Sequence, residues 1–333
     1  MKMRGLYTIK ICILICVLVF VLSPCTAFAA KKLVLADVSW DSVQVHNRIA
    51  GFILEHGYGY DVEYVPGDTI ALFAGMARGD IDITMELWVE NLGDLLVKAV
   101  KEGSVLDLGS NFPDSRQGWL VPTYVIKGDP ARGIKPLAPG LKSVSDLPKY
   151  WKVFKDVEDP GKGRFYTCLP GWNCLEINEV KMTTYGLNKY YNIFVPGSDA
   201  ALVGSMASAY KKGKPWFGYY WAPTWALGKY DMTFLEEPAY NKAAWDKNYG
   251  CAYPPVRVNI GVNAKMQEKA PEVVAFLSKY DTTQAICNKF LAYMQDNKAD
   301  TAEAALWFLK NYLDLWTPWV PADVAQKVKA AME

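Results

Sequence analysis

The sequence predicts an α/β protein with about two domains. Its 333 residues exceed the roughly 150 that one domain usually takes. Hydrophobic residues make up 51% of the chain and charged residues 21%, so the chain can bury a core and is not intrinsically disordered. Short strand-like apolar runs alternate with helical segments, the order that produces a parallel sheet with helices on its faces.

The elements of the first stretch follow from apolar spacing and from helix-start residues. Asp41 can cap a helix whose apolar residues recur at helical spacing. In chain order we expect a strand over 32–36, a helix over 41–56, a strand over 62–65, a helix over 69–77 and a strand over 81–87.

A second α/β stretch and a helical C-terminal region follow. Pro271 suits the first turn of a helix and Thr301 suits an N-cap. The expected helices are 145–154, 175–186, 198–211, 271–280, 283–295, 301–313 and 321–332, and the expected strands are 164–167, 191–195, 216–221 and 256–260. We expect the chain to cross between two lobes twice. The first lobe would then comprise 30–124 and 253–333, and the second lobe 125–252.

Residues 1–29 have the composition of a signal peptide. Basic residues precede an apolar run over 11–22, and Ala27-Phe28-Ala29 fits the A-x-A cleavage pattern. The run is too short to span a bilayer, although an N-terminal membrane anchor is the alternative. We therefore expect cleavage near Ala29 or Ala30 and export to the periplasm.

Charge and cysteine content agree with an exported chain. The formal charge is +1, and it becomes −2 when the three basic residues of the signal peptide are removed, so a nucleic acid partner is not expected. Cys168 and Cys174 lie six residues apart around a Pro-Gly turn, and a disulfide between them is favoured over a metal site. Cys251 and Cys287 form either a second bridge or two buried thiols.

The sequence contains no motif for catalysis. The patterns of serine hydrolases, zinc peptidases, P-loop proteins and dinucleotide-binding proteins do not occur. The two histidines, His46 and His56, are ten residues apart on one expected helix, where we expect surface or half-buried positions. We therefore expect no enzyme activity, no cofactor and no metal.

Tryptophan is the informative residue. Trp88 and Trp221 lie where expected strands end, Trp172 lies inside the loop between Cys168 and Cys174, and Trp40 follows the first strand. Ligands of open α/β sheets bind beyond the carboxyl ends of the strands. Several tryptophans in that place can form an aromatic cage, the usual site for a quaternary ammonium group.

These residues resemble those of the substrate-binding proteins of ABC importers for glycine betaine and proline betaine. The resemblance is most specific in C-x-x-G-W-x-C at 168–174. It implies a periplasmic-binding-protein fold of type II, with a ligand cleft between two hinged lobes. It also implies a box of Trp88, Trp172 and Trp221 around the quaternary ammonium, and a ligand carboxylate held by the N–H groups of Asn173 and Cys174.

The chain departs from this family at two positions near the first box tryptophan. Some members have a histidine where this sequence has Leu92, and Glu86 lies on the same strand face as Trp88. An acidic residue in the site would favour a ligand with net positive charge, such as choline. Ser39 and Trp40 are further candidates, as a hydrogen-bond donor and a fourth wall.

The expected function is that of a monomeric extracytoplasmic receptor. It would capture glycine betaine or a related quaternary amine and deliver it to an ABC permease. The alternative ligands in the same fold are choline, carnitine and a sulfonium analogue. A secreted enzyme is less favoured because no nucleophile is paired with a base, and a carbohydrate-binding module is less favoured because it needs an exposed tryptophan platform.

Overall fold

The structure, a computed structural model, describes residues 31–333. The expected signal peptide lies outside these residues. Lys31–Glu333 form one compact unit. Among the described residues, none of the helices combines the length and the apolar character needed to cross a membrane.

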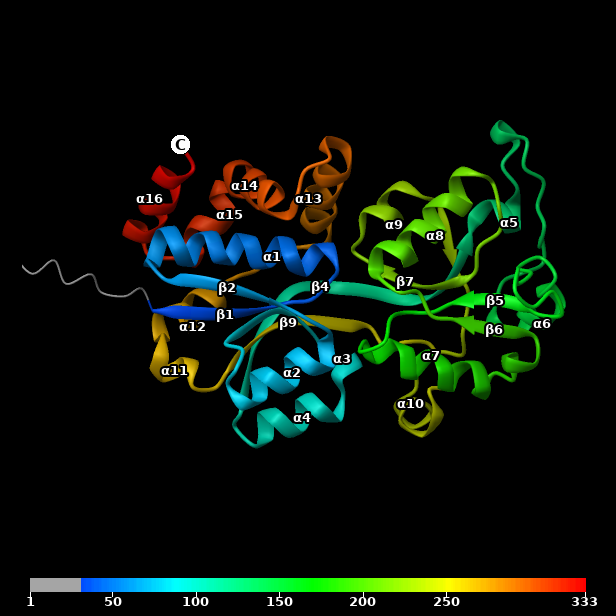
Figure 1. Cartoon of the computed structure of the whole chain (residues 1–333), viewed down its shortest axis with the longest axis horizontal. Helices are drawn as coiled ribbons and strands as arrows, with labels where there is room; N and C mark the ends of the chain where they lie inside the picture. The colour runs from blue at the N-terminus through cyan, green and yellow to red at the C-terminus, as the bar shows by residue number, and fades with distance from the viewer. Residues whose placement is uncertain (1–30) are drawn as a thin grey trace, which may run out of the picture. The chain divides into compact units, whose positions relative to one another are not determined.

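One mixed sheet of nine strands runs through this unit (Figure 1). The strand order is β2-β1-β3-β9-β4-β7-β5-β6, and β8 pairs with β4 beside this path. Parallel strand pairs occur in both halves of the sheet. In one half β1 pairs with β2 and β3, and in the other β5 pairs with β6 and β7. The strands are β1 (Lys32–Asp37), β2 (Asp61–Pro66), β3 (Ile83–Trp88), β4 (Val105–Pro122), β5 (Gly163–Tyr166), β6 (Tyr191–Phe194), β7 (Gly218–Ala222), β8 (Met232–Phe234) and β9 (Val256–Asn263).

Helices cover both faces of the sheet in each of two lobes, which confirms the predicted architecture. In the first lobe α1 and the C-terminal helices cover one face, and α2 and α4 cover the other (Figure 1). Its helices are α1 (Asp41–Phe52), α2 (Thr69–Arg78), α3 (Val89–Leu92), α4 (Asp94–Lys101), α11 (Met266–Lys269), α12 (Pro271–Leu277), α13 (Gln284–Asn297), α14 (Thr301–Asn311), α15 (Leu313–Trp316) and α16 (Ala322–Ala331). The second lobe contains α5 (Thr123–Lys127), α6 (Leu147–Tyr150), α7 (Asn173–Thr184), α8 (Asp199–Lys211), α9 (Trp225–Lys229) and α10 (Lys242–Asn248).

A single long strand, β4, belongs to both lobes. Its first part pairs with β9 as far as Ser115, and from Arg116 onward it pairs with β7. The pairing partner changes between two adjacent residues, so the sheets of the two lobes are continuous through one strand. The sequence did not predict this strand. The lobe boundary expected near residue 124 lies just beyond its end.

Burial in the structure corrects one prediction and decides between two alternatives. His46 is fully buried, whereas we expected a surface or half-buried position. Its Nδ1 lies 2.7 Å from the Tyr280 hydroxyl and its Nε2 lies 3.4 Å from Cys287 Sγ, so neighbours satisfy the ring without water. Burial lowers the pKa of His46 to about 3. Cys251 and Cys287 are both free and buried, the second of the two alternatives. His56 is exposed.

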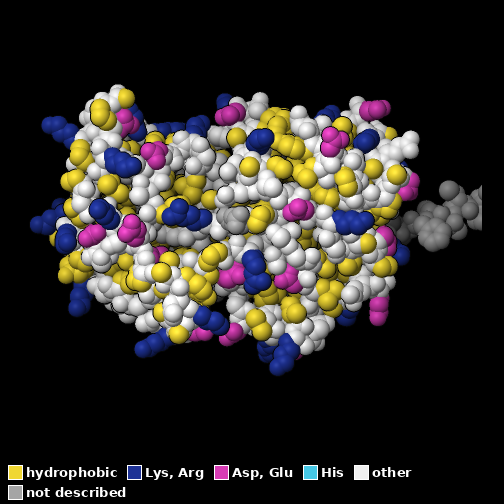
Figure 2. Space-filling view, turned by 180° about the vertical axis from the view of Figure 1, so that it is seen from behind, with side chains coloured by type: hydrophobic (Ala, Val, Ile, Leu, Met, Phe, Trp, Pro, Cys, Tyr) yellow, Lys and Arg dark blue, Asp and Glu magenta, His cyan; other side chains and the backbone are white. Residues whose placement is uncertain are grey.

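The surface carries both signs of charge. On the face seen in Figure 2, Lys and Arg side chains are interspersed with Asp and Glu. Described residues on this face form no continuous basic patch of the kind that follows a phosphate backbone.

Candidate functional site

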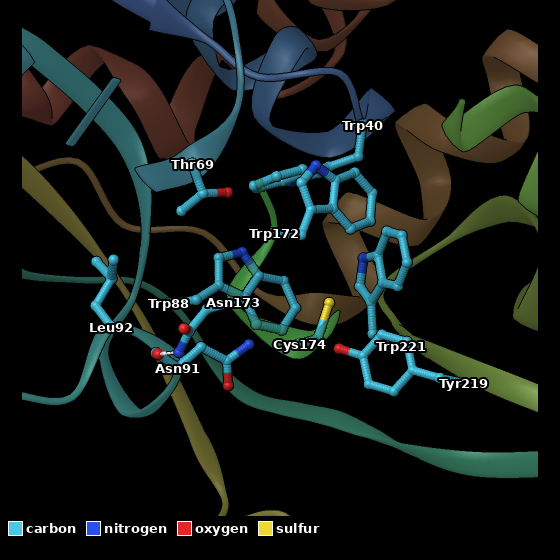
Figure 3. Close-up of a pocket in the computed structure, with 10 residues that line it drawn as sticks. All are labelled: Trp40, Thr69, Trp88, Asn91, Leu92, Trp172, Asn173, Cys174, Tyr219 and Trp221. Carbon is cyan, nitrogen blue, oxygen red and sulfur yellow. Dashed lines mark hydrogen bonds between the residues drawn. The ribbon is translucent and has the colours of Figure 1, made fainter. Parts of the chain in front are cut away.

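Four tryptophans from four different elements meet between the lobes (Figure 3). Trp40 precedes α1, Trp88 ends β3, Trp172 precedes α7 and Trp221 lies in β7. The Trp172 ring centroid lies 5.2 Å from that of Trp40 and 5.3 Å from that of Trp221, and the Trp40 and Trp88 centroids are 6.4 Å apart. Each pair is close to perpendicular, at 77–89°. Since each side chain is 4–6% exposed, the rings form an enclosed wall and not an exposed platform.

These rings line a cavity that both lobes build. Its solvent-accessible volume is about 40 Å³. The lining residues are Trp40, Thr69, Trp88, Asn91, Leu92, Trp172, Asn173, Cys174, Tyr219 and Trp221. Aromatic faces carry the negative part of the ring quadrupole, so such a wall attracts a cation that has little need of hydrogen bonds.

The N-terminus of α7 supplies the polar end of the cavity. Asn173 and Cys174 are the first two residues of this 12-residue helix, so their N–H groups have no partner within the helix. Trp172 is the N-cap residue of α7, and its side chain makes no capping hydrogen bond. Free N–H groups and the helix dipole together favour an anion or a negatively polarised oxygen at this point.

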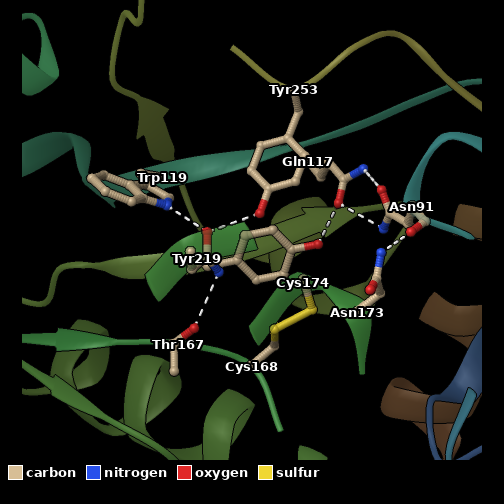
Figure 4. Close-up of a disulfide and its surroundings, with 10 residues drawn as sticks. Asn91, Gln117, Trp119, Thr167, Cys168, Asn173, Cys174, Tyr219 and Tyr253 are labelled. Atoms are coloured by element: carbon tan, nitrogen blue, oxygen red, sulfur yellow. Dashed lines mark hydrogen bonds between the residues drawn. A yellow bond between two sulfur atoms is a disulfide. The ribbon is translucent and has the colours of Figure 1, made fainter. Parts of the chain in front are cut away.

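The predicted disulfide between Cys168 and Cys174 is present (Figure 4). It joins the segment after β5 to the first turn of α7, with a Cα–Cα distance of 6.2 Å. Both cysteines are buried. The bridge therefore fixes the loop that carries Trp172 relative to the helix whose first two residues line the cavity.

A chain of polar side chains connects the lobes beneath the cavity (Figure 4). Asn173 Nδ2 donates to the Asn91 carbonyl oxygen. Asn91 and Gln117 exchange two side-chain hydrogen bonds, of 2.7 and 3.2 Å, and the Tyr219 hydroxyl donates to Gln117 Oε1. Sequence reasoning missed Asn91, Gln117 and Tyr219. Tyr219 could have been found, because it lies two residues before Trp221 on one strand and shares its face.

Glu86 lies behind the tryptophan wall. Its Oε2 accepts hydrogen bonds from Trp40 Nε1 at 2.7 Å and from Trp88 Nε1 at 3.1 Å, and its side chain lines a smaller neighbouring cavity with Thr69 and Leu92. The residue is 3% exposed, and burial raises the pKa of Glu86 to about 7. The carboxylate thus holds two rings of the wall without lining the main cavity itself.

Six of the predicted site residues line the main cavity, and Ser39 does not. Trp40, Trp88, Trp172, Trp221, Asn173 and Cys174 all line the one cavity. Ser39 does not: its side chain is exposed and outside the lining. Leu92, where some family members have histidine, is an apolar part of the wall.

Contacts between Asp68, Ile70 and Gly171 show that the lobes are closed over the cavity. The Ile70 N–H of the first lobe donates to the Gly171 carbonyl of the second at 3.3 Å. Gly171 has a φ of +83°, and a Cβ there would lie 2.5 Å from the Cβ of Asp68. Only glycine allows both this backbone conformation and this approach.

Comparison with known proteins agrees with the geometry. The family described as the substrate-binding domain of the ABC-type glycine betaine transport system, OpuAC, matches residues 31–311. A trimethylamine N-oxide-binding protein of Pelagibacter ubique is 24% identical, over 88% of this chain and 92% of its own length. The glycine betaine/proline betaine-binding periplasmic protein of Escherichia coli is 28% identical, over 73% of each chain.

Solved structures share the fold. The glycine betaine, L-proline-binding protein ProX of Borrelia burgdorferi has a TM-score of 0.73 and 21% identity, covering 90% of this chain and all of its own. Lactococcal OpuAC, in its closed form with glycine betaine, has a TM-score of 0.69 and 21% identity, covering 87% of this chain and all of its own. With the family match across most of its length, this chain belongs to the OpuAC family of substrate-binding domains of ABC-type glycine betaine transport systems.

Proposed function

We propose that the tryptophan-walled cavity binds a small trimethylammonium zwitterion, with glycine betaine as the first candidate. The role of solute-binding protein in an ABC transport system follows from the family. The observation that supports this ligand is the pairing of two unlike ends in one cavity. An aromatic wall of Trp40, Trp88, Trp172 and Trp221 suits the cation, and the N–H groups that begin α7 suit the carboxylate.

Both ends are needed for useful affinity. A desolvated cation–π contact is worth about 2 kcal/mol, so a cation that lies against three of the four rings gains about 6 kcal/mol. Micromolar binding requires about 8 kcal/mol beyond the costs of association. Charge-assisted hydrogen bonds at the N-terminus of α7 contribute about 1.5–3 kcal/mol each. Together with the rings they reach the energy that micromolar binding requires. Trimethylamine alone should therefore bind poorly.

The wall favours a ligand without net charge. Its described lining contains no Asp, Glu, Lys, Arg or His, so no charged side chain there balances a net charge on the ligand, and Leu92 is apolar at the position where some family members place a histidine. The Glu86 oxygen nearest the rings is already occupied by two indole N–H groups. Trimethylamine N-oxide is a second candidate, because its short acceptor end needs fewer donors and a relative is named for binding it.

We propose further that residues 1–29 direct export to the periplasm, where the chain acts as a monomer and delivers its ligand to a permease. Three relatives are named as periplasmic proteins. The first lobe would comprise 30–124 and 253–333, and the second lobe 125–252. No step requires catalysis, and the residues lining the cavity offer no nucleophile paired with a base.

Calorimetric titration of residues 30–333 with glycine betaine, trimethylamine N-oxide, carnitine, choline and a sulfonium analogue tests the ligand assignment. We expect the tightest binding for glycine betaine and at least tenfold weaker binding for choline. Tightest binding of choline would mean that Glu86 balances a net positive ligand, which would refute the zwitterion proposal. If none of these ligands gives a heat of binding, the proposed ligand site is refuted and only the family assignment stands.

A further inference from the structure

Thr69 brings a hydroxyl from the first lobe into the lining of the ligand cavity. It is the first residue of α2, and it lines both the main cavity and the smaller cavity behind the tryptophan wall. Figure 3 shows its hydroxyl turned toward the tryptophan rings and its methyl group turned away from them. No hydrogen bond joins this hydroxyl to the other residues that line the main cavity (Figure 3).

The other hydroxyl and amide side chains of the lining already donate to protein acceptors. Asn173 Nδ2 donates to the Asn91 carbonyl oxygen. Asn91 Nδ2 and the Tyr219 hydroxyl both donate to Gln117 Oε1. Two of the four indole N–H groups donate to a carboxylate behind the wall. Since the lining also contains no Lys, Arg or His, the Thr69 hydroxyl is the one that remains free to donate to an oxygen of the ligand.

Thr69 also lies at the boundary between the lobes. The N–H of the next residue, Ile70, donates to the Gly171 carbonyl of the second lobe at 3.3 Å. Gly171 is two residues before Asn173, the first residue of α7. The starts of α2 and α7, one from each lobe, therefore border the same cavity. The dipoles of both helices favour negative charge on a ligand between them, in addition to the hydrogen bond that the Thr69 hydroxyl can donate.

We propose that Thr69 is a specificity-determining residue, whose hydroxyl binds one oxygen of the ligand's acidic end while the N-terminus of α7 binds another. This inference rests on the proposed function. A carboxylate or a sulfonate carries more than one oxygen, so it contacts both lobes at once and holds them together. The single oxygen of an N-oxide is attached directly to the cationic nitrogen, and rings that hold this nitrogen keep the oxygen from contacting both lobes. Thr69 therefore selects carboxylates and sulfonates over trimethylamine N-oxide.

Thr69→Val tests this role, because valine keeps the shape of threonine and lacks the hydroxyl. In calorimetry of residues 30–333 we expect glycine betaine to bind at least tenfold more weakly, the loss of one hydrogen bond to a charged oxygen. The affinity for trimethylamine N-oxide should change less than about threefold. Thr69→Ser keeps the hydroxyl and should keep glycine betaine affinity within about threefold. Thr301→Val is the matched control, since Thr301 is the half-buried first residue of α14, outside the cavity. Circular dichroism checks that each variant folds.

The pattern across ligands and variants separates the hydroxyl from mere packing. Equal losses for both ligands in Thr69→Val would show that the side chain supports the wall, and equal losses in Thr69→Val and Thr69→Ser would assign the effect to the methyl group. Either result would overturn the role of Thr69, as would unchanged glycine betaine affinity in Thr69→Val. These three results leave the proposed function standing. Wild type that binds only trimethylamine N-oxide would overturn the selection of carboxylates, and wild type that binds neither ligand would overturn both proposals.

Discussion

Glu86→Gln tests whether charge behind the tryptophan wall contributes to binding. The substitution keeps an oxygen that can accept from Trp40 and Trp88 but removes the negative charge. At an effective dielectric constant of about 20, opposite charges about 7 Å apart attract by about 2 kcal/mol, and we take this as the scale of the effect. That energy corresponds to roughly thirtyfold in affinity. We expect this loss at pH 8, where Glu86 is ionised.

The pH dependence makes the test specific. Because the pKa of Glu86 is raised to about 7 in the free protein, the carboxyl is largely neutral at pH 5.5. A cation in the wall favours the ionised form, so wild-type affinity should rise from pH 5.5 to pH 8 and a proton should be released near pH 7. Calorimetry in buffers of different ionisation enthalpy measures that proton. The affinity of Glu86→Gln should be flat over the same range.

The free energy of unfolding should fall as the pH rises, whereas the ligand affinity should rise. A carboxyl whose pKa rises from 4.5 to about 7 on folding stabilises the folded state below pH 4.5, and this contribution is lost by pH 7. The loss is about 3 kcal/mol. Denaturant unfolding should show this loss in wild type, and Glu86→Gln should lose about 3 kcal/mol less over the same pH range. Glu63→Gln, on the exposed edge strand β2, is the matched control. Equal affinity of wild type and Glu86→Gln at pH 8 would refute the reasoning.

Three further changes probe the wall, the closure and the bridge. Trp172→Ala should weaken ligand binding at least tenfold. One ring is worth about 2 kcal/mol, and a tenfold change in affinity corresponds to only about 1.4 kcal/mol. Gly171→Ala should also weaken it at least tenfold, since the new Cβ would meet Asp68 when the lobes close. Reduction of the bridge between Cys168 and Cys174 should weaken binding more than it lowers Tm, since closing a ring of about seven residues is worth roughly 2 kcal/mol of stability. Calorimetry and thermal unfolding measure all three.

Matched controls separate these effects from general damage. Gly186→Ala places a Cβ at a similar φ, +66°, with no atom within 4 Å, so it should keep ligand affinity. Trp151→Ala removes a half-buried ring outside the cavity and should do the same. Unchanged affinity in Trp172→Ala would remove that ring from the site. A drop in Tm with full affinity after reduction would make the bridge purely structural.

Regular elements of this fold could be predicted from spacing, and the strand that joins the lobes could not. The helix expected over 69–77 is observed as Thr69–Arg78, and the strand expected over 191–195 as Tyr191–Phe194. The strand Val105–Pro122 contains Gly109 and Pro113, and its pairing with β9 shifts register three times. Bulges and polar residues erase the alternation by which a strand is recognised in a sequence.

The same limit applied to the site. The tryptophans were predictable because strand ends and a short cystine loop are local features. The roles of Asn91 and Gln117 depend on which surfaces meet when two lobes close, and no short-range pattern carries that information. His46 was misjudged because its partner Cys287 lies 241 residues away.

The continuity of β4 has a consequence for how this receptor is tuned. The strand pairs with β9 as far as Ser115 and with β7 from Arg116, so this step is a place where the chain passes from one lobe to the other. A substitution there alters the fraction of molecules able to close. Apparent affinity scales with that fraction by the same factor for every ligand. The wall sets the order in which solutes are preferred, and the strand sets the concentration at which all of them are captured.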